Sequence, residues 1–61
     1  MTNYLAINKN NEVKRIHNTT DLDFDRDLAK TRKDAVRYGW TIVKGEENEG
    51  YLPLIARLGA R

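Results

Sequence analysis

The apolar positions near the N-terminus alternate as a β-strand requires. Within Tyr4–Ile7, Leu5 and Ile7 fall on one side of an extended chain and the other two residues fall on the opposite side. The run Asn8–Asn11 follows, and asparagine favours turns because it tolerates positive φ and bonds its own backbone. Val13–Ile16 then resumes a strand-like pattern. The start of the chain therefore predicts a β-hairpin.

The middle of the chain has the period of an amphipathic helix. Thr20 with Asp23 resembles a capping box, and no glycine or proline interrupts Leu22–Tyr38. At about 100° per residue, one face of this helix collects apolar or small side chains, namely Phe24, Leu28, Thr31, Ala35 and Tyr38. The opposite face collects cations, namely Arg26, Lys30, Lys33 and Arg37. Gly39 stands where a left-handed residue commonly ends a helix. We therefore expect one surface helix that packs on a core.

The C-terminal third predicts further strands. Trp40–Val43 is aromatic and β-branched, and an acidic loop bracketed by glycines follows it. Leu52–Leu58 has alternating apolar positions, so we interpret it as an edge strand that tolerates Pro53. The alternative is a helix of one or two turns with Pro53 at its first position and Gly59 just after its end. We favour the strand, because a glycine-bracketed loop between two apolar runs suggests a hairpin.

These elements predict a single α+β domain over residues 1–61 with the order β-β-α-β-β. One amphipathic helix would pack on a small antiparallel or mixed sheet. Because one helix covers one face, the other sheet face would be partly bare, with an unfinished edge at Pro53. A large apolar face of this kind is uncommon on a monomer. The bare face is therefore either small, with scattered exposed apolar groups, or covered by a second copy or another protein.

Composition narrows the class of protein. The 61 residues include 11 Lys and Arg against 9 Asp and Glu, for a net charge of +2. No cysteine is present, which excludes disulfides and thiolate metal sites. No secretory leader or membrane-spanning run can be recognised. We therefore expect a cytoplasmic protein that does not enter membranes.

Few residues could carry catalysis or hold a metal. His17 is the single histidine, and the glycines are isolated, so neither a catalytic relay nor a phosphate-binding loop can be assembled. The alternating aspartates of Asp21–Asp27 resemble the start of a calcium-binding loop, but Arg26 stands where that loop needs glycine. Acidic residues at a helix start are better explained by the helix dipole. We predict no enzymatic activity, no cofactor and no metal site.

The best candidate for function is the basic helix face. Its four cations, together with Lys14 and Arg15 of the hairpin, are our candidate binding residues. A solvated helix face is the simplest interpretation, since residues 21–38 hold five aspartates against five cations. Docking on a protein and contact with nucleic-acid phosphates are the two functional interpretations.

The sequence predicts a small non-catalytic binding protein that docks on a larger protein or protein–nucleic-acid complex. A regulator or inhibitor fits this description, including the compact accessory proteins made by phages and mobile elements. The contact would use the basic helix face or a strand added at the open sheet edge. The alternative is direct binding of DNA or RNA through the same cations, and a third possibility is a homodimer through the bare sheet face.

Overall fold

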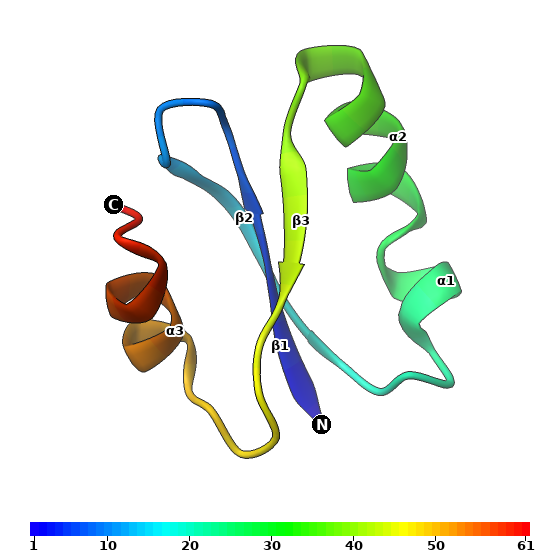
Figure 1. The fold of residues 1–61 in the computed structure, drawn as a ribbon. Helices are drawn as coiled ribbons and strands as arrows, with labels where there is room; N and C mark the ends of the chain where they lie inside the picture. The colour runs from blue at the N-terminus through cyan, green and yellow to red at the C-terminus, as the bar shows by residue number, and fades with distance from the viewer.

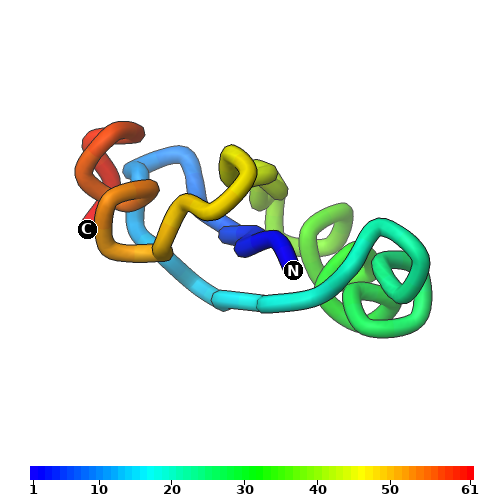
Figure 2. The backbone as a smooth tube through the Cα atoms, turned by 90° about the horizontal axis from the view of Figure 1, so that it is seen from below, coloured from blue at the N-terminus to red at the C-terminus, as the bar shows by residue number.

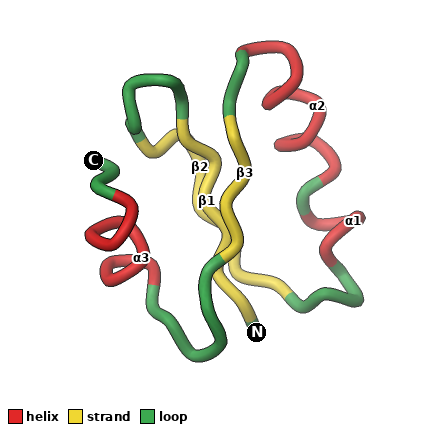
Figure 3. Tube along the Cα trace, viewed as in Figure 1, coloured by secondary structure: helices red, strands yellow, loops and turns green.

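The fold combines three strands with three helical segments, and the computed structural model describes all residues 1–61. The elements are β1 (Thr2–Ile7), β2 (Val13–Thr19), α1 (Phe24–Asp27), α2 (Ala29–Tyr38), β3 (Thr41–Lys44) and α3 (Tyr51–Leu58). The strands form one antiparallel sheet in the order β2-β1-β3 (Figures 1 and 3). The predicted small α+β fold is confirmed.

The predicted N-terminal hairpin is present, with β2 continuing past Ile16. Its turn is closed by the side chain of Asn8, whose Oδ1 accepts the backbone N–H groups of Asn10 and Glu12, each at 2.9 Å. Asn11 takes a positive φ of 59°, a conformation that asparagine tolerates better than most residues. The turn therefore forms for the reason that the asparagine-rich sequence indicates.

The central strand β1 is buried on both of its faces. The ring of Tyr4 packs on Phe24 of α1 with 4.9 Å between centroids. On the other face, Leu5 and Ile7 form the core cluster with Leu54 of α3. Viewed from below, the strands lie between α1 and α2 on one side and α3 on the other (Figure 2). The molecule is thus a thin three-layer arrangement of helix, sheet and helix.

The expected uninterrupted helix over Leu22–Tyr38 is wrong in one respect. It is divided into α1 and α2 at Leu28, which is fully buried and has φ −101° and ψ 7°. The first segment is fastened to the end of β2, because Thr19 Oγ1 donates a hydrogen bond of 2.5 Å to Asp27. The ring of Phe24 packs on β1 in the same region. At the break α1 keeps these contacts, and α2 lies against β3 and reaches β2 through the side chains of Thr31 and Asp34.

The inner face of the helical region is mostly as predicted. Leu28, Thr31 and Ala35 are buried. Tyr38 is a correction, because it is 56% exposed and stacks on Trp40 at 5.3 Å instead of entering the core. Gly39 is left-handed at φ 75°, as predicted, and the N–H of Trp40 donates to Ala35 O at 2.9 Å. This bond closes the helix end and directs the chain into β3.

The last segment is a helix, so the predicted fourth strand is wrong. Pro53 is the third residue of α3, within the first turn, where an N–H has no intrahelical acceptor to lose. Gly59 ends the helix with φ 66°. Leu54 is fully buried, whereas Leu52 is 68% exposed, although strand alternation would place both on one face. The spacing of buried positions follows a helical turn.

The second sheet face is therefore covered rather than bare. The apolar side chains that pack around the core cluster on this face come from β2, β3, α3 and the C-terminus, and they are Val13, Val43, Ile55, Leu58 and Ala60. The helix α3 covers this face. A fourth strand would instead have widened the sheet and left more of this face exposed. The expectation of an apolar sheet face left open for a second copy is corrected by α3.

We predict that Leu54→Ala greatly destabilises the fold. Truncating a buried leucine costs about 2–5 kcal/mol, a large part of the roughly 3–9 kcal/mol expected for a domain of this length. Leu52→Ala, two residues away in the same helix, is the matched control and should change stability by less than about 0.5 kcal/mol. Urea unfolding followed by circular dichroism measures both. Equal effects of the two substitutions would contradict the helical packing of α3.

Candidate functional site

The aspartates of the helical region all form ion pairs. Their cationic partners come from α1, α2, β2 and β3, and the pairs are Asp21–Lys44, Asp23–Arg26, Asp27–Arg26, Asp25–Arg32 and Asp34–Arg15. The aspartates of the alternating run thus face separate partners rather than a common centre. No group of three or more His, Asp or Glu side chains is gathered closely enough to hold a metal ion.

Three cations on α2 have no ion-pair partner. Lys30, Lys33 and Arg37 are exposed, and none of them lies within salt-bridge distance of a carboxylate. We call them the α2 basic row. Their spacing places them within about 60° of one helix face and along roughly 10 Å of its axis. Thr31 and Ala35 are the buried residues of α2 and lie on the opposite side.

The other three predicted binding residues lie elsewhere. Arg26 belongs to α1 and is held by aspartates at 3.2 and 3.3 Å, so it does not continue the row. Lys14 is exposed on β2, where the register shifts by one residue. Arg15 contacts Asp34 at 2.6 Å and Thr31 at 3.3 Å. The structure therefore places Arg15 in the packing of β2 against α2 rather than on a free surface.

The C-terminal end of α2 carries an aromatic stack that sequence analysis missed. Tyr38 and Trp40 lie with their rings tilted by 31°. The guanidinium of Arg37 is 5.3 Å from the Tyr38 ring, and that of Arg15 is 5.1 Å from the Trp40 ring. Cations over aromatic faces are favourable contacts. The only signal in the sequence was the pair of aromatics flanking Gly39, which we had assigned to the core and to a strand.

His17 is a structural residue. Its Nε2 shares a hydrogen bond of 2.7 Å with Thr31 Oγ1, which joins β2 to α2. Thr31 is nearly fully buried, and its hydroxyl is satisfied by this contact and by Arg15. The polar side chains between sheet and helix therefore hold the two layers in register.

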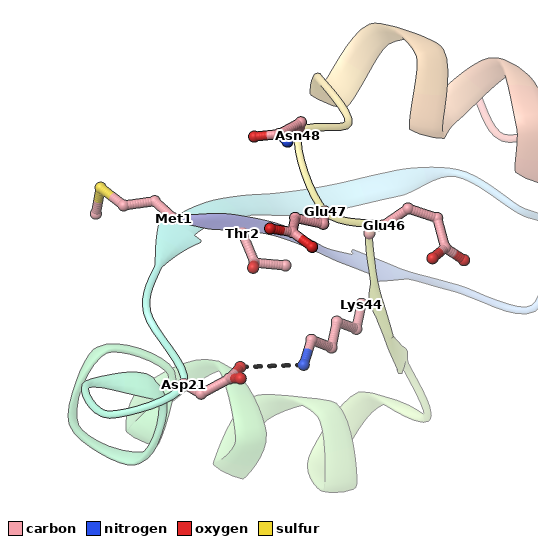
Figure 4. A pocket seen from close by; sticks show the side chains of 8 residues that line it. Met1, Thr2, Asp21, Lys44, Glu46, Glu47 and Asn48 are labelled. Carbon is pink, nitrogen blue, oxygen red and sulfur yellow. Dashed lines mark hydrogen bonds and ion pairs between the residues drawn. The ribbon is translucent and has the colours of Figure 1, made fainter.

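A polar hollow of about 620 Å³ opens at the end of the sheet that carries the N-terminus (Figure 4). Lys44 Nζ donates to Asp21 at 3.0 Å across this hollow, and the Tyr4 hydroxyl donates to the same oxygen at 3.0 Å. These bonds lower the pKa of Asp21 and raise that of Lys44. Burial, followed by the bond to Asp21, raises the pKa of Tyr4. Tyr4, Asp21 and Lys44 thus bond to one another, and the carboxylates of Glu46 and Glu47 also line the hollow.

A second hollow, of about 410 Å³, lies between the helices and β3. Tyr4, Phe24 and Ile42 line it together with Arg32 and Lys44. Both cations are in ion pairs with aspartates, at 2.8 Å for Arg32 and 3.0 Å for Lys44. The hollow is therefore electrically balanced, in contrast to the α2 basic row.

Comparisons of the chain with protein-family models, with curated proteins and with solved structures found no match. None of the helices combines the length and the apolar character needed to cross a lipid bilayer.

We predict that the Thr19–Asp27 hydrogen bond makes stability depend on pH. This bond is the main cause of the lowered pKa of Asp27. A carboxyl whose pKa is lower in the folded state stabilises the fold above its unfolded pKa of about 3.9, and this stabilisation is lost as the pH falls through the folded pKa. Thr19→Val should therefore be less stable than wild type at neutral pH, and the difference should shrink in acid.

Urea unfolding at about pH 7, 5 and 3 measures this difference. Thr2→Val is the matched control, because Thr2 is the cross-strand partner of Thr19 and its hydroxyl donates no bond to a carboxylate. For Thr2→Val, the difference in unfolding free energy from wild type should stay the same at all three pH values. A Thr19→Val difference that stays constant with pH would contradict the prediction.

Proposed function

We propose that this chain is a non-catalytic binding protein that docks on an acidic surface of a larger protein through the α2 basic row. One observation carries the proposal. The aspartates of the helical region are all in ion pairs with other cations, which leaves Lys30, Lys33 and Arg37 unpaired on one exposed face. A partner's carboxylates can reach these cations without breaking an existing pair.

The neighbouring aromatics extend the proposed surface. A standard interface takes about 800 Å² from each partner, roughly a fifth of this chain's 4332 Å² of accessible surface. The row alone is too small for this, but Tyr38 and Trp40 adjoin it through Arg37. Tyrosine, tryptophan and arginine are the residues most enriched at protein interfaces. By occupying a partner's surface, the chain would act as a regulator or inhibitor.

Direct binding of nucleic acid is the second candidate, supported by the same three cations. Contacts with three phosphates would lower the logarithm of the binding constant by about 2.7 for each tenfold rise in salt. Single-strand binders usually add open aromatic faces for base stacking. Here Tyr38 and Trp40 already contact each other and an arginine each, which favours a protein partner.

The test compares two charge-reversed variants in affinity capture from nuclease-treated lysate of the source organism. Lys33→Glu changes the row, and Lys9→Glu changes one unpaired cation of the hairpin turn by the same net charge. We expect a protein that wild type and the control retain and that the row variant loses. With that protein purified, its dissociation constant for the row variant should be at least about tenfold higher.

Two outcomes would overturn the proposal. Equal retention of the same proteins by both variants would remove the α2 basic row as the docking face. Binding of labelled DNA or RNA that weakens steeply with salt, and that the row variant loses, would replace a protein partner by nucleic acid.

A further inference from the structure

Strand β2 is an open edge of the sheet. It pairs with β1 only, so its other side presents backbone N–H and C=O groups without a strand partner. Edge strands are often protected from pairing by prolines, charged side chains or bulges, and Ile16–Thr19 of β2 contains none of these. The charged Lys14 and the register shift stand at its start, and no proline occurs within Val13–Thr19. The other edge strand, β3, is shorter, at four residues.

The C-terminal residue of the chain already bonds to this side of β2. The N–H of Arg61 donates to Asn11 O at 2.9 Å, and the N–H of Val13 donates to Arg61 O at 2.8 Å. One residue bonded to two alternate residues of a neighbouring strand is the hydrogen-bond pattern of a parallel pair. Asn11 lies in the turn and Val13 is the first residue of β2, so this pairing ends where the strand begins and leaves the later residues of β2 unpaired on this side.

The α2 basic row stands on the same side of the molecule as this edge. Asp34 of α2 reaches Arg15 of β2 at 2.6 Å, so this side of the helix faces β2. At about 100° per residue, Lys30 and Arg37 lie roughly 40° and 60° from Asp34, turned away from the core. On the opposite flank of α2, Arg32 lies over Phe24 and lines the hollow beside β3. The row therefore lies on the flank of α2 that reaches β2 through the Asp34–Arg15 pair, while the backbone of α2 lies against β3.

The other sheet face beside this edge has one exposed apolar side chain, Ile16, next to the polar Asn18. Ile16 pairs with Leu5 of the core cluster, yet it is 45% exposed, because α3 covers β1 more fully than β2. A strand added next to β2 would present alternate side chains to the two faces. One set would meet the cations of α2, and the other would meet Ile16.

We propose that the partner contributes an extended segment that adds to β2 as a fourth strand, with acidic residues toward the α2 basic row alternating with apolar residues toward Ile16. This inference rests on the proposed function and specifies the conformation and chemistry of the docked segment. A second copy of the chain fits poorly. Antiparallel pairing of two β2 strands in one continuous sheet would bring the two basic rows to the same face.

The probe is a blocked heptapeptide of alternating glutamate and valine, compared with an isomer in which four glutamates precede three valines. Titration into the ¹⁵N-labelled protein, followed by NMR, measures both dissociation constants. We expect the alternating peptide to bind at least about tenfold more tightly. It should also slow hydrogen exchange at alternate amides of Lys14–Thr19 by about tenfold or more, because alternate N–H groups point to the same side of a strand. Exchange within β3 should not change.

Two variants separate the edge from the charges. Ile16→Lys places a charge at the added strand's apolar face and should weaken the alternating peptide by about tenfold. Thr41→Lys, on the same sheet face of the other edge strand, is the matched control and should bind like wild type. Circular dichroism checks that both variants are folded. The hydrogen-exchange measurement on the wild-type protein tests strand addition independently of both variants.

The outcomes distinguish this inference from the proposed function. Equal binding of the two peptides, without protection of β2, would overturn strand addition. If that binding is lost in Lys33→Glu, the acidic docking face still stands. Failure of both peptides to bind at millimolar concentration would also overturn strand addition, while the capture experiment judges the docking face separately.

Discussion

The constraint on which the structure depends is the burial of β1 on both of its faces. Four consecutive residues, Tyr4–Ile7, are buried, which requires a cover on each side of a sheet only three strands wide. The helices α1 and α2 cover the face of Tyr4, and α3 covers the face of Leu5 and Ile7. The three helical segments serve as these covers on the two faces. The outer side of β2 has no strand partner in this arrangement.

Residue types correctly predicted those turns and helix ends that depend only on neighbouring residues in the sequence. The Asn8 turn and Gly39 at the end of α2 behave as their residue types indicate. The last element was mispredicted, because Leu52–Leu58 satisfies both the strand and the helix pattern. Long-range packing decides between them, since a helix can place Leu54 over Leu5 and cover the second sheet face. The break at Leu28 likewise depends on contacts with β1 and β2 that no local pattern contains.

Part of the candidate site could be predicted from the sequence. Helical periodicity alone groups Lys30, Lys33 and Arg37, and the structure keeps them on one exposed face. Periodicity could not show that Arg15 contacts Asp34, because these residues are 19 positions apart and meet only when α2 packs on β2. The aromatic stack at Trp40 arises from the same packing. Tertiary contacts, rather than residue types, determine which cations remain free.

This distribution also changes the meaning of the net charge. A value of +2, with equal numbers of aspartates and cations in the helical region, suggested a surface without electrostatic direction. Exposed ion pairs contribute about 0–1 kcal/mol each, so the exposed pairs Asp21–Lys44 and Asp25–Arg32 add little to stability. Their larger effect is on the surface. The aspartates neutralise the charges of Arg15, Arg26 and Arg32 locally. The positive charge that remains on α2 is that of the α2 basic row, on the flank toward β2. Charge and free backbone groups therefore meet along one side of a small molecule, where a single extended acidic segment could engage both.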